Sequence, residues 1–273
     1  MHRRIVQSLS LIGLHASWGP QAKWICNPVL SCHSCALSWF ACPIGVFVHY
    51  AGYHIFPFMA VGMVVLVGAL AGRLLCGWVC PFGFLQDMLY KIRSPKVTLP
   101  EWTRYVKYGV LVVTVIAIPF LLGESTMWSF CRGCPAAAIQ VGLPDWILGG
   151  FGALTPAQVA RFGILAAVIG LAIVSLRGFC RMLCPIGAMM APLNYVSGWA
   201  VAPLSPCRGC RQCDSVCPTD VRPSAMINRG LPPSRQLDCI VCHDCQTVCP
   251  EGGAKTRNNT APEASIIIAE ESL

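Results

Sequence analysis

The stretch CRGCRQCDSVCP (residues 207–218) is followed by CIVCHDCQTVCP (residues 239–250), and both have the spacing C-x2-C-x2-C-x3-C-P. With this spacing, the first three cysteines of a run bind one [4Fe-4S] cluster and the fourth binds the other. We therefore expect two clusters, one held by Cys207, Cys210, Cys213 and Cys249, the other by Cys239, Cys242, Cys245 and Cys217. Two zinc ribbons are the alternative, but zinc takes four ligands per ion and leaves the trailing Cys-Pro without a role.

A second repeat lies upstream, as LCGWVCPFG (residues 75–83) and FCRMLCPIG (residues 179–187). Proline suits the first turn of a helix, so each motif predicts a helix that starts just after its second cysteine. A helix N-terminus also favours the thiolate form of a preceding cysteine. Together the motifs supply four ligands, which predicts an inner membrane-edge cluster bound by Cys76, Cys80, Cys180 and Cys184.

The composition favours a membrane protein. Hydrophobic residues make up 55% of the 273 residues and charged residues only 12%, against about 25% charged in an average soluble domain. Apolar stretches at residues 5–18, 56–75, 105–122 and 159–176 approach the length of about 20 residues that spans a bilayer. We predict four transmembrane helices, of which the first is the shortest and has no signal-peptide cleavage site after it.

Lysine and arginine are concentrated between the second and third predicted spans and after the fourth. Short loops rich in these residues stay on the cytoplasmic side. We therefore expect a multi-pass protein of a bacterial-type cytoplasmic (inner) membrane, with both termini and the C-terminal cysteine runs in the cytoplasm. The net charge of +8 is not accompanied by a basic helix with interleaved aromatics, so the expected partner is the lipid membrane and not nucleic acid.

Six cysteines fall in the loops on the other side of the membrane, and two of them, Cys42 and Cys134, again precede proline. We predict an outer membrane-edge cluster bound by Cys35, Cys42, Cys131 and Cys134, with Cys32 as an alternative ligand. Six thiols exceed four ligands, so disulfides, including one at Cys26, or inert buried thiols remain open for the surplus.

The expected fold is an α-helical integral membrane protein, with about four transmembrane helices and extra short helices started by Cys-Pro, plus a small C-terminal α+β two-cluster ferredoxin-like domain. We place the transmembrane domain at residues 1–200, the ferredoxin-like domain at 201–255 and a tail at 256–273. A soluble domain this small needs cross-links to be stable, and two bound clusters would provide them.

Five titratable residues in the outer loops are candidates for handling protons, because histidine titrates near neutral pH and a membrane-edge carboxylate can be tuned. They are His33, His49, His54, Glu124 and Asp145. For each of them a simply solvated side chain is the commoner interpretation.

The two Cys-x-x-x-Cys-Pro motifs around spans two to four, followed by the two ferredoxin runs, resemble the NapH/NosR/CcoG-type membrane polyferredoxins, and most of all the NapH-type quinol dehydrogenase membrane subunit. The resemblance implies transfer of electrons from quinol through [4Fe-4S] clusters toward a periplasmic reductase, and a cytoplasmic ferredoxin domain. The outer cysteines go beyond the NapH-type pattern, which leaves the donor and acceptor open.

The predicted function is that of a membrane-bound iron-sulfur electron-transfer subunit, working between a quinol or periplasmic redox partner and the cytoplasmic ferredoxin domain. We expect no catalytic residue in this chain and one or two clusters in the membrane domain besides the two C-terminal ones. No Walker loop, dinucleotide fingerprint or haem attachment motif occurs. The alternatives are a stand-alone copper-type reductase that presents Cys26 or Cys32 to a soft metal ion, and an assembly factor for another metalloenzyme.

Overall fold

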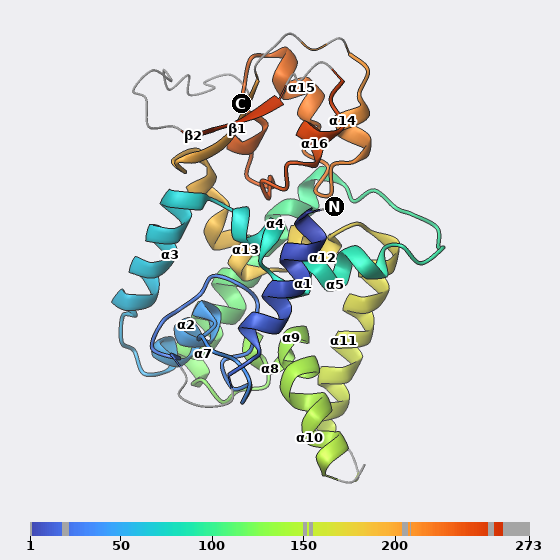
Figure 1. Cartoon of the computed structure of the whole chain (residues 1–273). Coiled ribbons are helices and arrows are strands. Elements are labelled where there is room, and N and C mark those ends of the chain that lie inside the picture. Colours follow the sequence, from blue (N-terminus) through green and yellow to red (C-terminus); the bar gives the residue numbers. More distant parts are fainter. Residues whose placement is uncertain are drawn as a thin grey trace.

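The structure is a computed structural model that describes residues 2–17, 22–149, 152, 155–203, 207, 209–250 and 254–258. Figure 1 shows a helical body that carries a smaller part, built from the residues after Gly198, at one end. The N-terminus lies where these two parts meet (Figure 1). Most of the described chain is helical, as the sequence predicts.

The helical body contains many short helices, because Cys-Pro pairs begin new helices and glycines end them. In order they are α1 (His2–Leu14), α2 (Pro43–Gly52), α3 (Phe58–Ala71), α4 (Leu74–Trp78), α5 (Pro81–Leu89), η1 (Glu101–Tyr105), α6 (Val106–Val110), η2 (Leu111–Ala117), α7 (Ile118–Leu122), α8 (Phe130–Gly133), α9 (Pro135–Ala137), η3 (Ala138–Gly142), α10 (Leu143–Leu148), α11 (Pro156–Val174), α12 (Gly178–Met182), α13 (Pro185–Met190) and η4 (Pro192–Tyr195). The segments η1, α6, η2 and α7 follow one another without a break and form one long helix.

Two of these helices are long and apolar enough to cross a membrane. They are Glu101–Leu122, with 22 residues, and Pro156–Val174, with 19, each with a mean hydropathy of 2.0. The second begins at a capping box, in which the Thr155 hydroxyl accepts a hydrogen bond from the Gln158 amide and the Gln158 side chain accepts one from the Thr155 amide. The first two predicted spans form the helices α1 and α3, with 13 and 14 residues, which are shorter than the span of about 20 residues. The four-span topology stays a prediction.

The four Cys-Pro pairs of the helical body each start a helix, as predicted. Proline occupies the first turn of α2, α5, α9 and α13, and the N-caps are Cys42, Cys80, Cys134 and Cys184. Each of these cysteines has an extended backbone conformation while the next residue is already helical. The proline has no N–H to leave unsatisfied there, so the restart costs no hydrogen bond.

The smaller part is closed by two antiparallel strands. β1 (Trp199–Pro203) pairs with β2 (Ala254–Asn258), with Trp199 opposite Asn258 and Pro203 opposite Ala254. Between the strands lie α14 (Gln212–Ser215), α15 (Pro223–Asn228), η5 (Pro233–Arg235) and α16 (Asp244–Thr247). Val201, Ile227 and Val241 form its small buried core. The strands thus bracket both cysteine runs, while the predicted domain limits remain untested.

Buried polar contacts join the two parts. The Asp238 carboxylate of the smaller part pairs with the Lys107 ammonium of the long helix and lies 3.8 Å from Arg73 Nη1. Arg73 Nη1 also donates to the Leu237 carbonyl at 2.7 Å. The buried Asn194 side chain donates to the carbonyls of Gln236 and Cys239, at 2.9 and 2.8 Å. These contacts hold the smaller part in one position on the helical body.

We predict that Asp238→Asn strongly destabilises the protein. The side chains of Lys107 and Arg73 are 0% and 1% exposed, and the variant would leave them without a carboxylate. Breaking a buried ion pair from one side costs about 3–5 kcal/mol. Thermal unfolding of the protein in detergent would measure the loss. The matched control is Glu101→Gln, whose carboxylate pairs with Arg104 in an exposed position and contributes at most about 1 kcal/mol. Equal effects of the two variants would contradict the role of Asp238.

Candidate iron-sulfur sites

The inner site is the group Cys76, Cys80, Cys180 and Cys184, which come from α4, the N-cap of α5, α12 and the N-cap of α13. Cys80, Cys180 and Cys184 are buried and Cys76 is half-buried. The Cys184 thiol interacts electrostatically with the other three. The structure therefore brings together the four cysteines that the two repeats predict.

Hydrogen bonds reach the sulfur atoms of the inner site. The buried Gln86 side chain donates to Cys180 Sγ at 3.1 Å, and the Gly187 amide points at Cys184 Sγ at 3.5 Å. Burial nevertheless raises the pKa of Cys80 and of Cys184, the N-caps of α5 and α13, so the helix N-terminus does not by itself make these two thiols anionic. Coordination to a metal does remove the thiol proton. A set of four thiols, three of them buried, with N–H donors aimed at sulfur fits one iron-sulfur cluster.

The second cysteine run and one cysteine of the first run surround a small cavity. Cys217, Cys239, Cys242 and Cys245 all line it, together with apolar residues such as Val201 and Ile240. Cys217 Sγ accepts a hydrogen bond from the Val221 amide at 3.4 Å. We call these four cysteines the proximal ferredoxin set, because they lie next to the helical body. The crossed ligand assignment requires this placement of Cys217.

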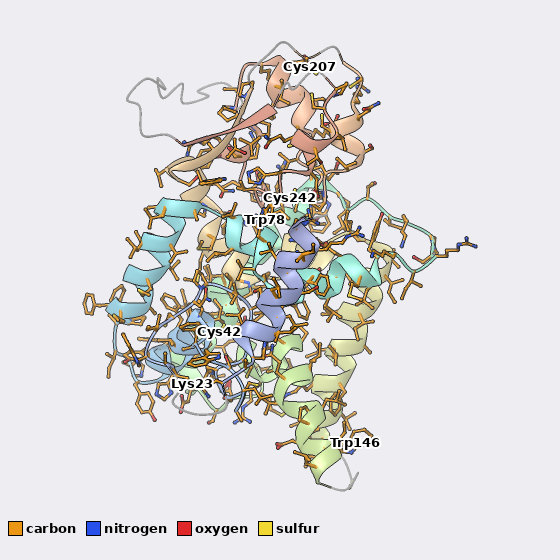
Figure 2. The ribbon with its side chains drawn as sticks, in the orientation of Figure 1. Lys23, Cys42, Trp78, Trp146, Cys207 and Cys242 are labelled. Atoms are coloured by element: carbon orange, nitrogen blue, oxygen red, sulfur yellow. The ribbon has the colours of Figure 1, made fainter. Side chains whose placement is uncertain are left out.

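The remaining C-terminal cysteines form the distal ferredoxin set: Cys207, Cys210, Cys213 and Cys249. The Cys213 thiol interacts electrostatically with Cys207 and Cys210. Cys213 is buried, Cys207 and Cys249 are half-buried, and Cys210 is exposed. In Figure 2, Cys207 lies at the end of the smaller part farthest from Cys42. This set is therefore nearest to the solvent.

The outer cysteines gather around a cavity of about 440 Å³, which is lined by Cys32, Cys42, Cys131 and Cys134. Cys35, which the sequence favoured over Cys32, is buried but does not line the cavity. Burial raises the pKa of Cys42 to about 12. We call the four lining cysteines the outer site; like the inner site, they offer four thiols in an apolar core.

Gln140 explains why Cys32 faces this cavity. Its side-chain oxygen, on η3, accepts a hydrogen bond from the Cys32 amide at 2.6 Å. Two of the six outer cysteines, Cys35 and Cys26, do not line the cavity. Cys26 packs against Ala41 and Ala60 in a separate small core. In the described part of the chain none of the six outer cysteines is in a disulfide. The surplus thiols are therefore buried, one of the two outcomes that the sequence left open.

Three of the predicted proton-handling residues line the outer cavity: His33, His49 and Glu124. The His49 imidazole contacts the Glu124 carboxylate through its Nδ1. Burial and the nearby Lys23 lower the pKa of His33, which keeps its imidazole neutral at physiological pH. The other two candidates do not line the cavity: the His54 ring packs edge-on against Phe120, and Asp145 lies in α10.

A buried hydroxyl group that lines the same cavity has no hydrogen-bond partner among the described residues. Ser129 lines the outer cavity, is buried, and its Oγ makes no hydrogen bond. Among the described residues no three His, Cys, Asp or Glu side chains converge on a point where a single metal ion could sit. A four-iron cluster instead takes one thiol per iron, so its ligands surround a body and not a point. The donor sets and the unpartnered hydroxyl fit such a group.

The sites touch one another through the backbone. The Leu30 backbone lies beside the Cys80 thiol of the inner site and lowers its pKa, and Leu30 also lines the outer cavity. On the other side, a Cβ atom on Gly77 would lie 2.4 Å from the Ile240 carbonyl oxygen. Trp78 Nε1 donates to the Val241 carbonyl at 3.1 Å, and Figure 2 places Trp78 beside Cys242. The inner site therefore lies between the outer site and the proximal ferredoxin set.

Sequence analysis missed two residues of the inner site. Arg73 and Arg177 precede Cys76 and Cys180 by three positions each, and both are buried. The signal was present, because the repeat can be extended to R-x2-C-x3-C-P-x-G in both copies.

Comparison with known proteins agrees with this geometry. The 4Fe-4S binding domain family matches residues 53–100 and 158–201, and each match holds one apolar helix and one inner-site motif. The chain is 25% identical over 197 residues to an uncharacterized protein of Methanocaldococcus jannaschii, covering 68% of this chain and 73% of that protein. It is 28% identical over 200 residues to the ferredoxin-type protein NapH of Escherichia coli, covering 69% and 63%.

A third relative is the methylamine utilization ferredoxin-type protein MauN of Methylorubrum extorquens, which is 30% identical over 154 residues, or 54% of this chain and 48% of that protein. The chain thus spans less than two thirds of the length of NapH and MauN. No solved structure matches the chain significantly.

We predict that Gly77→Ala weakens the contact between the inner-site motif and the proximal ferredoxin set. The added methyl group would meet a backbone carbonyl that no side-chain rotation can remove, and such overpacking costs about 1–3 kcal/mol. Thermal unfolding and limited proteolysis between the two parts would report the change. Gly62→Ala, where a Cβ atom meets nothing within 4 Å, is the control and should leave both unchanged. A Gly77→Ala protein as stable and protease-resistant as the control would contradict the contact.

Proposed function

Because the chain belongs to the NapH-type family of ferredoxin-like polyferredoxins, we propose that this iron-sulfur electron-transfer protein relays electrons through four clusters in series. The single observation that carries the proposal is the continuous line of contacts from the outer cavity, through the inner site, to the two ferredoxin sets. Each [4Fe-4S] cluster, when bound, takes up and releases one electron. The chain itself would contribute ligands, positions and surroundings, and no catalytic residue.

The proposed ligands are the four groups of cysteines described above. The outer site uses Cys32 in place of Cys35, because Cys32 lines the cavity with the other three ligands. The proposed order is outer site, inner site, proximal ferredoxin set and distal ferredoxin set. Leu30 bridges the first pair, the Gly77 and Ile240 backbones bridge the second, and the contact of α14 with α16 bridges the third.

We propose that the long helices carry this line of sites through a bacterial-type cytoplasmic membrane. The helix Glu101–Leu122 and α11 are apolar, and few of their residues are fully buried within the protein. Apolar side chains at such exposure are expected where lipid covers them. The lysine and arginine residues near the smaller part support a cytoplasmic position for the ferredoxin sets.

We propose that electrons leave through the distal ferredoxin set, or enter there if the flow is reversed. Cys210 is exposed, so a cluster in this set would lie within reach of a redox partner subunit on the cytoplasmic side. Two proteins to which this chain is similar, NapH and MauN, are named as ferredoxin-type proteins. The exposed ligand favours a partner protein over a small soluble substrate at this end.

At the other end, quinol is the donor that we propose for the outer cavity. Oxidation of a quinol releases protons with the electrons, so a proton acceptor must lie beside the cluster. The His49 and Glu124 pair lines the same cavity as the four thiols. A stand-alone copper-type reductase would present Cys26 or Cys32 outward to a soft metal ion; Cys26 is buried, whereas Cys32 is half-buried and lines the outer cavity, so this alternative depends on Cys32.

Iron content tests the proposal directly. We expect about sixteen iron atoms and as many acid-labile sulfides per purified wild-type chain, four per [4Fe-4S] cluster. Cys32→Ser should lose about four of each, whereas Cys35→Ser, the matched control three residues away in the same loop, should lose none. Iron for only two clusters in the wild type would reduce the protein to a tethered ferredoxin and overturn the relay. Loss with Cys35→Ser alone would overturn the choice of Cys32.

We also predict that Glu124→Gln slows reduction of the clusters by quinol. The amide cannot accept a proton, and removal of a positioned general base lowers a rate by about 10²–10⁴-fold. Stopped-flow reduction with a water-soluble quinol analogue would measure the rate, and reduction with dithionite, which delivers electrons without protons, should be unchanged. Asp145→Asn is the control on the same outer side. An unaltered quinol rate would remove Glu124 from the proton path.

A further inference from the structure

Arg73 and Arg177 occupy equivalent places in two copies of one extended motif. The copies read RLLCGWVCPFG at residues 73–83 and RGFCRMLCPIG at residues 177–187. Both guanidinium groups are almost fully buried, with 1% and 0% of the residue exposed. In Figure 1 the helices that carry the motifs, α4, α5, α12 and α13, gather where the helical body meets the smaller part.

Each arginine packs on the glycine of the other copy. A Cβ atom on Gly83 would lie 3.2 Å from Arg177 Nη1, and one on Gly187 would lie 3.0 Å from Arg73 Nη2. The same two Cβ atoms would lie 3.2 Å from the Cys76 carbonyl and 3.1 Å from the Cys180 carbonyl. The arginine of each motif copy therefore packs against the glycine of the other copy. Because glycine has no side chain, it leaves space for the guanidinium group.

The charges around the two arginines differ. Arg177 is held by Asp87 at 2.8 and 2.7 Å, and Arg3 joins Asp87 and Asp244, so two cations meet two carboxylates. Around Arg73, Asp238 is the one carboxylate among the described residues that pairs with Arg73 and Lys107. One buried positive charge remains uncompensated beside the inner site.

The Arg73 side chain also has an unused hydrogen-bond donor. Nε is buried and has no partner in the described structure, whereas Nη1 donates to Leu237. Arg73 interacts electrostatically with three inner-site thiols, Cys76, Cys180 and Cys184. A buried guanidinium N–H without a partner costs free energy unless a ligand accepts from it. A sulfur atom of a bound cluster is an acceptor of the right kind.

We propose that Arg73, with Arg177 as its counterpart in the repeat, sets the reduction potential of the inner cluster. The proposal rests on the inner cluster of the proposed function. Four thiolates give a [4Fe-4S] cluster a net negative charge, and the uptake of one electron makes it more negative. The uncompensated guanidinium favours the reduced form and so raises the potential, and the unused N–H would act in the same direction. Arg73 is therefore a positioning and tuning residue and not a ligand.

A redox titration of the purified full chain, followed by electron paramagnetic resonance, tests this role. Arg73→Gln should lower the reduction equilibrium constant of the inner cluster at least tenfold, a shift of about 59 mV for one electron, with iron content unchanged. Arg73→Lys keeps the charge and should shift the potential less. Arg104→Gln, which removes an exposed arginine, should shift nothing. The inner-cluster signal is identified as the one lost in Cys184→Ser.

Each outcome separates this proposal from the proposed function. Absence of any Cys184-dependent signal in the wild type overturns the proposed inner cluster itself. A present signal with the same potential in Arg73→Gln overturns only the role of Arg73. If Arg73→Gln does not fold, Arg73→Met replaces it, because it also removes the charge and the N–H donors while keeping a long side chain, and it should lower the potential in the same direction. An unchanged potential in that variant overturns the role equally.

Discussion

Burial in an apolar core opposes the ionisation of a thiol, and this constraint organises the rest of the molecule. Burial raises the pKa of Cys42 and of Cys180 to about 12, although each lies near backbone or side-chain N–H donors. The helix starts after Cys-Pro position the sulfur atoms but do not charge them. A bound metal cluster would remove the thiol protons, and the arginines, Gln86 and the first-turn amides would then stabilise the negative charge that results.

The same constraint explains the repeated use of one local device. Proline after cysteine starts a helix, and glycine two positions after that proline leaves space for a nitrogen-bearing side chain from elsewhere. At Gly83 and Gly187 this side chain is an arginine, and at Gly45 it is His33, whose Nδ1 would lie 2.4 Å from an added Cβ. In the fourth pair Ala137 takes the glycine place. The outer and inner sites are thus variants of one design with different neighbours.

Local features of the sequence were predicted well, because they depend on the residues themselves. The four helix starts after Cys-Pro follow from the chemistry of proline, and the grouping of Cys76 with Cys180 follows from two copies of one motif. The sequence could not predict which of Cys32 and Cys35 lines the outer cavity. The Cys32 amide is held there by a hydrogen bond to Gln140, more than a hundred positions away. The buried arginines were missed because a cation beside an apolar span resembles an ordinary membrane-flanking charge. The arginine shared by the two motif copies is the sequence signal that sets them apart, and their contacts with Asp87 and Asp238 show that they are buried and paired.

The contact between Gly77 and Ile240 has a mechanical consequence. It joins main chain to main chain, and Asn194, Trp78 and Asp238 fasten the same two parts around it. The smaller part is therefore held in a fixed position on the helical body by backbone and side-chain contacts. Electrons would pass through a fixed bridge of constant width, so their transfer at this junction would depend neither on diffusion of a domain nor on the viscosity of the medium.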